Sequence, residues 1–184
     1  KSTMAYHLIN YILSNGEEFS YDTNKNEINL LNRSFKLVQN ESNMNFNLID
    51  INLDKKNIDI NQIRTLIQNL RKSSFNNKPR FILIDNLEFL NKNSINALLK
   101  ILEEPNDNIY FIMINNNKKI LPTLRSRFLD FKIFLSNEEA QLVCNDLLGG
   151  NLSQYINEEF LDYYITPGKI LNLIKFSEEN SIDL

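Results

Sequence analysis

Residues that could bind a phosphate lie at the start of the sequence. Lys1, Ser2 and Thr3 open a predicted helix. In a phosphate-binding loop, a lysine at this position reaches the β- and γ-phosphates and a hydroxyl holds magnesium. The glycines of such a loop do not precede these residues in the sequence. Taken alone, the triplet is therefore more often a plain helix cap.

A second candidate is the acid that closes an apolar run, Asp85 in "RFILID". Parallel sheets bind ligands at the carboxyl ends of their strands, and an aspartate there can position a magnesium-bound water. The alternative is an aspartate that merely forms a turn. Asp85 by itself does not decide between the two.

Metal and thiol chemistry have few candidate residues. The chain has one cysteine, Cys144, and one histidine, His7, so it can form neither a disulfide framework nor a zinc site. Cys144 lies on the apolar side of a predicted helix, which indicates a buried, unreactive thiol. We expect His7 to be an ordinary residue on a helix face.

Composition is typical of a soluble globular protein, with 184 residues, 42% hydrophobic and 23% charged. No apolar run approaches the roughly 20 residues that span a bilayer. The first residues are too polar for a secretory signal. We therefore expect a cytoplasmic protein with no membrane partner.

The net charge of −3 hides an asymmetry between two parts of the chain. Residues 1–136 hold 18 basic and 14 acidic residues (+4), whereas residues 137–184 hold 2 and 9 (−7). Opposite charge in the two parts predicts two domains. The many asparagines are spread along the chain and indicate no particular chemistry.

Hydrophobic periodicity predicts alternating strands and helices, followed by helices alone. Predicted helices are 3–14, 59–73, one capped by Ser94 and ended by Pro105, 137–148, 157–165 and 167–180; predicted strands are 35–39, 46–51, 80–85, 109–114 and 131–134. The first part thus predicts an α/β domain with a parallel sheet, and residues 137–184 a small helical domain.

Residues 81–128 resemble the central segment of the clamp-loader subunits of bacterial DNA polymerase III, which are AAA+ proteins, and most closely the delta-prime type. In this resemblance, 80–85 is the Walker B strand, 97–105 ("ALLKILEEP") a family helix, 110–115 the sensor 1 strand and 126–128 ("SRF") the serine-arginine-cysteine motif. Segments 58–70 and 166–174 resemble flanking family segments, the latter the sensor 2 region of a helical lid.

One departure from the family bears on ATP hydrolysis. Active relatives carry a glutamate after the Walker B aspartate, and this chain has Asn86. An amide cannot take a proton from water at neutral pH, so we expect little or no hydrolysis. The resemblance agrees, because delta-prime subunits typically do not hydrolyse ATP.

The resemblance assigns Arg127 as an arginine finger that acts in trans on a neighbour's ATP. A planar cation there would stabilise charge that develops on the γ-phosphate. The alternative is a surface salt bridge, since Asp130 is close in sequence. Phe128 replaces the family cysteine, and we expect it to pack inward.

Two further residues follow from the resemblance. Asn115 is the sensor 1 candidate, although a turn role is as plausible for a run of asparagines. Lys169 replaces the usual sensor 2 arginine and could touch a phosphate without bidentate geometry, or lie on a solvated helix face. The chain lacks the cysteines of the zinc module that many relatives carry.

Glu103 and Glu104 are unusual because they end a predicted helix. The negative pole of the helix dipole disfavours carboxylates there. We expect basic groups, within the chain or across an interface, to offset this cost. The alternative is that local packing overrides a small penalty.

The leading hypothesis is a largely non-hydrolysing clamp-loader subunit that helps to load a sliding clamp onto primed DNA. Its expected partners are gamma/tau-type and delta-type subunits, the clamp and DNA; ATP and magnesium are possible ligands. The alternatives are a hydrolysing gamma/tau-type motor and an unrelated P-loop enzyme, for which no catalytic residues are found. Without a complete phosphate loop and a C-terminal collar domain, the chain is expected to be a fragment.

Overall fold

A computed structural model describes residues 1–51, 55, 57–70, 76–104, 107–116, 119–157, 159 and 165–182. The chain divides into two compact units, Lys1–Asp130 and Phe131–Leu184. The boundary thus precedes the one predicted at residue 136. No helix in the described ranges is long and apolar enough to cross a membrane.

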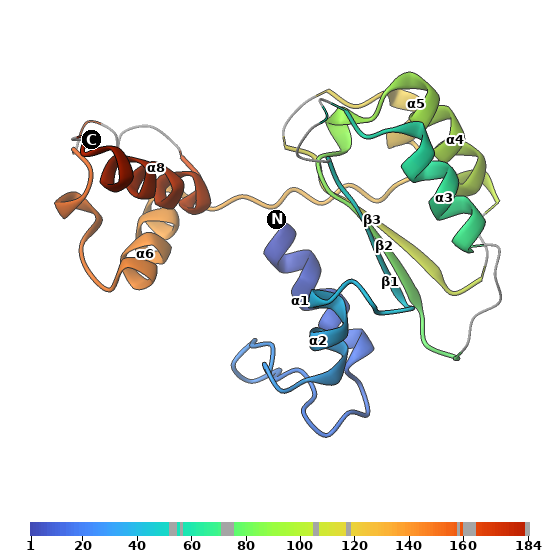
Figure 1. The fold of residues 1–184 in the computed structure, drawn as a ribbon, viewed down its shortest axis with the longest axis horizontal. Coiled ribbons are helices and arrows are strands. Elements are labelled where there is room, and N and C mark those ends of the chain that lie inside the picture. The colour runs from blue at the N-terminus through green and yellow to red at the C-terminus, as the bar shows by residue number, and fades with distance from the viewer. Residues whose placement is uncertain are drawn as a thin grey trace. The chain divides into compact units, whose positions relative to one another are not determined.

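The first unit is a parallel sheet with helices on both faces (Figure 1). Its elements are α1 (Ser2–Leu13), α2 (Arg33–Gln39), β1 (Phe46–Ile49), α3 (Ile60–Leu70), β2 (Arg80–Ile84), η1 (Leu87–Phe89), α4 (Lys92–Glu103), β3 (Ile109–Met113) and α5 (Pro122–Arg125). The strand order is β1-β2-β3, and both pairings are parallel. The predicted α/β class is confirmed.

The central strand β2 has hydrophobic side chains on both faces, which explains its continuous apolar sequence. Ile82 and Ile84 pack in the core formed with α3 and α4, whereas Phe81 and Leu83 pack with α1. Successive side chains of a strand point to opposite faces, so one strand supplies both cores. Figure 1 shows α3 and α4 on one side of the sheet and α1 on the other.

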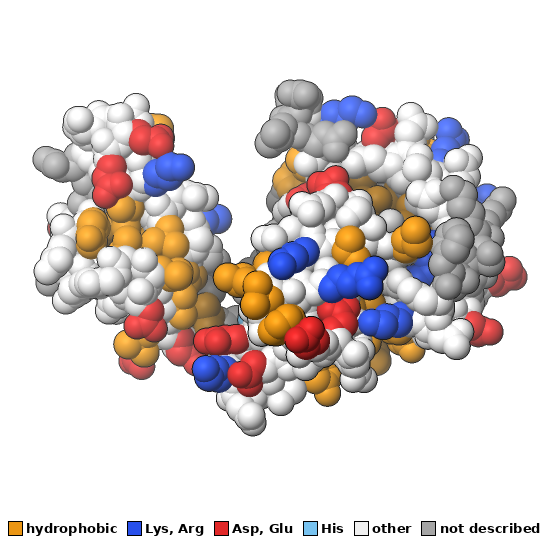
Figure 2. Space-filling model, turned by 60° about the horizontal axis from the view of Figure 1, so that its bottom comes forward, with side chains coloured by type: hydrophobic (Ala, Val, Ile, Leu, Met, Phe, Trp, Pro, Cys, Tyr) orange, Lys and Arg blue, Asp and Glu red, His pale blue; other side chains and the backbone are white. Residues whose placement is uncertain are grey.

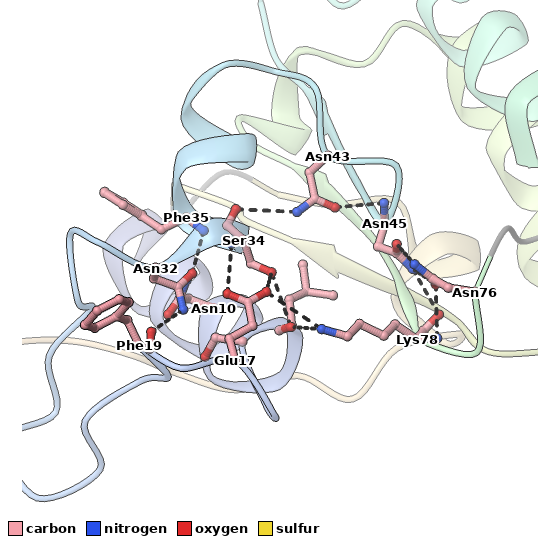
Figure 3. Close-up of polar contacts among 12 residues, drawn as sticks. Asn10, Glu17, Phe19, Asn32, Ser34, Phe35, Asn43, Asn45, Asn76 and Lys78 are labelled. Carbon is pink, nitrogen blue, oxygen red and sulfur yellow. Dashed lines mark hydrogen bonds and ion pairs between the residues drawn. The ribbon is translucent and has the colours of Figure 1, made fainter.

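At the amino ends of the strands, a polar network ties the sheet to α1 and α2 (Figure 3). The buried amide of Asn45 donates to Asn76 Oδ1 (3.0 Å), to the Lys78 carbonyl (3.0 Å) and to the Pro79 carbonyl (3.2 Å). Glu17 accepts hydrogen bonds from the hydroxyl of Ser34 (2.5 Å) and from its backbone N–H (3.1 Å). Lys78 Nζ lies 3.8 Å from Glu17 Oε1 and donates to the Leu13 carbonyl (2.6 Å).

Three element predictions in the sequence were wrong. Residues 35–39, predicted as a strand, lie in α2, because the Asn32 side chain caps that helix by accepting from Phe35 N (2.6 Å). Helix α4 is capped by Asn91 rather than Ser94, which is buried and donates to the Ile58 carbonyl. Residues 131–134 form no strand, and Phe131 and Phe134 are exposed there.

The second unit is helical where it is described, as predicted. Its elements are α6 (Asn137–Leu148), η2 (Leu152–Gln154) and α8 (Pro167–Asn180). A capping box between Ser136 and Glu139 starts α6. Cys144 is fully buried in the small core of this unit, and burial raises the pKa of its thiol, as expected for an unreactive cysteine. Most of predicted helix 157–165 and the predicted helix end at Pro105 lie outside the described residues.

The helical unit also carries hydrophobic side chains at its surface (Figure 2). They come from both long helices: Leu142, Val143 and Leu147 on α6, and Leu173 and Phe176 on α8. A two-helix core this small leaves part of each helix without a packing partner within the described part of the unit.

Candidate functional site

The carboxyl ends of the three parallel strands bring polar residues to one edge of the sheet. Asp50 follows β1, Asp85 follows β2, and Asn115 lies two residues after β3. The register pairs Ile49 with Ile84 and Ile84 with Met113, so the three strands end level with one another. This edge is the position at which open α/β sheets bind ligands.

The start of α1 lies at the same edge. Ser2 Oγ donates to Asp85 Oδ2 at 2.6 Å, and Lys1 Nζ donates to the Asn115 carbonyl at 2.7 Å. Thr3 is exposed next to them. Four of the predicted residues, from three separate segments, therefore lie together: a cation, a hydroxyl, a carboxylate and an amide-bearing residue. Such a set fits a phosphate group with its magnesium ion.

Asn86 bridges the ends of all three strands. Its backbone is in the left-handed region, with φ 55° and ψ 47°, which asparagine tolerates better than most residues. Its Nδ2 donates to Asp50 Oδ1 (2.8 Å), and its Oδ1 accepts from Asn116 Nδ2 (2.9 Å). The amide that replaces the family glutamate is thus fully engaged in linking β1, β2 and β3.

The carboxylates of this edge affect the pKa of Tyr6, which lies on α1. Its phenol has a raised pKa, first because it is partly buried and then because Asp85, Asp50 and Glu41 carry negative charge nearby. Its ring also contacts Phe46, with 5.8 Å between the centroids. Tyr6 therefore lies close enough to the carboxylates of Asp85 and Asp50 for their charge to disfavour its ionised form.

Arg127 belongs to a second group, just after α5. Its Nη2 donates to Glu103 Oε1 at 2.6 Å, and its Nη1 donates to the Thr123 carbonyl at 2.6 Å. Arg127 thus forms a surface salt bridge, which was the alternative to the finger role, but its partner is Glu103. Asp130, the acid close in sequence, pairs with Arg125 instead (2.8 Å). Phe128 is partly buried and packs against the α3–α4 core, as expected.

The two remaining predictions have different outcomes. The ion pair of Glu103 agrees with the expected compensation at the helix end, whereas Glu104 forms no ion pair with any described residue. Lys169 lies in the first turn of α8, in the other unit, and its contact with a phosphate stays a prediction.

The sequence interpretation missed Asp50 and Asn116. Asp50 closes the apolar strand β1 just as Asp85 closes β2, so the same criterion applied to both strands would have found it. Asn116 has no such signal, because it stands in a run of asparagines that were given no weight.

Residues 2–135 match the family described as "DNA polymerase III, delta subunit". The chain belongs to this family. The predicted resemblance to DNA polymerase III clamp-loader proteins is therefore confirmed. Together with the parallel sheet, membership identifies the first unit as an AAA+ α/β fold.

Individual relatives carry more than one subunit name. DNA polymerase III subunit gamma of Buchnera aphidicola from Schizaphis graminum is 38% identical over 81 residues, which cover 44% of this chain and 22% of the relative. Subunit delta' of Buchnera aphidicola from Baizongia pistaciae is 34% identical over 88 residues, 47% of this chain and 26% of the relative. The chain thus spans about a quarter of the length of these curated relatives.

A solved structure was also matched, a DNA polymerase III gamma subunit-related protein from Thermotoga maritima. It is 22% identical, with a TM-score of 0.47, and the match covers 70% of this chain and 42% of that chain.

Proposed function

We propose that this chain is part of a clamp-loader subunit of the delta-prime type that does not hydrolyse ATP itself. It supplies Arg127 to the ATP site of a neighbouring gamma/tau-type subunit. Within the assembled complex it takes part in loading the sliding clamp onto primed DNA. Family membership supports the complex, and the site geometry supports the role.

The observation that carries the proposal is the state of Asn86. Hydrolysis needs a base that polarises the attacking water, and an amide cannot serve as that base. Moreover, both polar atoms of this amide are already hydrogen-bonded to Asp50 and Asn116. The side chain is suited to hold strand ends together rather than to activate a water.

The residues of the site are better suited to binding a nucleotide than to hydrolysing it. Lys1, Ser2 and Asp85 would hold the phosphates and magnesium of a bound ATP, with Asn115 beside them. Their mutual contacts already place them within reach of one ligand. A bound but unhydrolysed nucleotide would then have a structural role.

Arg127 has the features that a finger requires. It follows a short helix, its side chain is 31% exposed, and its guanidinium keeps further N–H donors beyond the two that are used. An arginine supplied in trans can raise phosphoryl-transfer rates by roughly 10³-fold or more.

The second candidate function is a gamma/tau-type motor. Relatives named gamma match at an identity similar to those named delta', and the Lys1–Ser2–Asp85 arrangement is what a motor would also need. Asn86 argues against it. The two functions differ in whether the subunit hydrolyses ATP alone.

The test uses the full-length version of this chain, alone and in a reconstituted clamp-loader complex. We expect no hydrolysis by the subunit alone. Arg127→Ala should lower hydrolysis at the neighbouring site by roughly 10³-fold, seen as loss of that site's share of DNA-stimulated activity. Arg125→Ala, two residues away and paired with Asp130, is the matched control. Hydrolysis by the subunit alone, with Arg127 dispensable, would show a motor.

A further inference from the structure

The ion pair between Glu103 and Arg127 joins two segments that the chain keeps apart. Glu103 is the last residue of α4, and Arg127 follows α5. Their side chains meet at 2.6 Å, with Glu103 54% and Arg127 31% exposed. The contact therefore lies at the surface, where another molecule can reach the guanidinium.

The position of Glu103 explains why the ion pair is favourable when no nucleotide of a neighbouring subunit is bound to Arg127. A carboxylate in the last turn of a helix faces the partial negative charge of the free carbonyls. The guanidinium of Arg127 offsets that repulsion and is fixed on its other side by the Thr123 carbonyl. Arg127 is thus held in one orientation by two acceptors from the same unit.

The pair is nevertheless weak enough to open. Exposed ion pairs contribute about 0.2–1 kcal/mol, whereas a bidentate contact between arginine and a phosphate is among the strongest charge-assisted hydrogen bonds. A triphosphate brought to this surface would therefore compete successfully with one carboxylate oxygen. While Glu103 stays in place, its negative charge opposes the approach of that phosphate.

We propose that Glu103 is an internal competitor for Arg127, holding the guanidinium until the phosphate of a neighbouring subunit's nucleotide displaces the carboxylate. This inference rests on the proposed function of Arg127. Glu103 would then set the nucleotide concentration at which the finger engages, without touching the reacting atoms. It is a positioning residue, not a catalytic one.

Glu104 provides the matched control. It has the same charge and is exposed at the same helix end, but it lines the groove between α3 and α4, with Arg64 and Lys100, instead of contacting Arg127. Removing its charge changes the net charge of the surface equally. Any effect specific to Glu103 therefore reports the ion pair.

The experiment uses the complex reconstituted with the full-length chain, in which the neighbouring site is the only ATP site left active. Glu103→Gln should lower the ATP concentration for half-maximal hydrolysis about two- to fivefold, the factor that an exposed ion pair represents. The maximal rate should stay unchanged. Glu104→Gln should leave both the half-maximal concentration and the maximal rate unchanged.

A second measurement follows the ion pair directly, without hydrolysis. Arginine-specific dicarbonyl modification of the full-length subunit, mapped by mass spectrometry, should modify Arg127 faster in Glu103→Gln than in wild type. Arg125 serves as the internal reference, because its partner is Asp130. Unchanged modification of Arg127 would overturn the inference.

The outcomes separate the two proposals. If Arg127→Ala leaves the neighbouring site active, the proposed function fails whatever Glu103 does. If Arg127→Ala is harmful but Glu103→Gln leaves the half-maximal concentration unchanged, raises it, or lowers the maximal rate, only the competitor role fails.

Discussion

The amino and carboxyl edges of the sheet carry similar polar residues, but these residues have different roles at the two edges. At the amino edge, the Asn45 amide donates to two backbone carbonyls and an amide, and Glu17 has Lys78 and Ser34 as partners. At the carboxyl edge, Asp50 and Asp85 form no ion pair with any described residue. The carboxylate at the amino edge has a lysine as partner, whereas the two carboxylates at the carboxyl edge accept hydrogen bonds from uncharged donors.

The difference indicates which edge of the sheet contributes to stability and which edge is available for binding a ligand. Satisfied buried polar groups specify a fold and are costly to disturb. Carboxylates that accept hydrogen bonds from uncharged donors at a partly exposed edge contribute less to stability and can still bind the cation of a ligand. The comparison therefore predicts that substitutions at the amino edge lower stability, while those at the carboxyl edge do not.

The largest effect is expected from Asn45→Ala. This change removes a buried amide and leaves the partly buried carbonyls of Lys78 and Pro79 without their donor, at a cost of about 2 kcal/mol in the free energy of unfolding. Urea denaturation measures it. Asn77→Ala, at an exposed neighbouring position, should change stability by less than about 0.5 kcal/mol. Equal effects of the two substitutions would show that the polar network at the amino edge contributes no more to stability than an exposed position does.

A paired removal of charge compares the two edges directly. Glu17→Gln should cost about 1.5 kcal/mol, because a largely buried carboxylate loses charge-assisted bonds from Ser34 and the attraction of Lys78. Asp50→Asn should stay within about 0.5 kcal/mol of wild type, since an amide oxygen can still accept from Asn86 while one negative charge is removed. The same denaturation assay applies. If Asp50→Asn costs as much as Glu17→Gln, the carboxyl edge is a structural network too.

The smallest effect concerns pH. The folded state raises the pKa of Tyr6 above the ordinary value of 10.0, so the unfolded chain loses this proton first as pH increases. Its contribution to stability is complete below pH 10 and is lost as pH rises through the raised pKa. Tyr6→Phe should therefore show a shallower fall in stability between pH 9 and pH 11 than wild type. A wild-type slope in Tyr6→Phe would contradict this prediction.

Features of the fold and of the candidate site could be predicted from the sequence only where the residues that indicate them lie close together in the sequence. The apolar run of β2 and the acid after it are local, so both the strand and Asp85 were found from the sequence. The helix α2 depends on one cap from Asn32, and the short segment 35–39, with the apolar residues Phe35, Leu37 and Val38, resembled a strand instead. The bridge of Asn86 to Asp50 and Asn116 and the pair of Arg127 with Glu103 join distant segments. Sequence periodicity contains no information about such contacts.

The parallel pairing of β2 also has a consequence for how the chain folds. Phe81 pairs with Phe46 on one side and with Tyr110 on the other, so each pairing must close a loop of about 30 residues before any sheet contact forms. Such non-local pairing slows folding. During synthesis β1 emerges before β2, and the apolar β2 segment emerges before its other partner β3. The apolar side chains of the strand that is buried on both faces in the native state are thus exposed while the protein is being made, when they can associate with other chains.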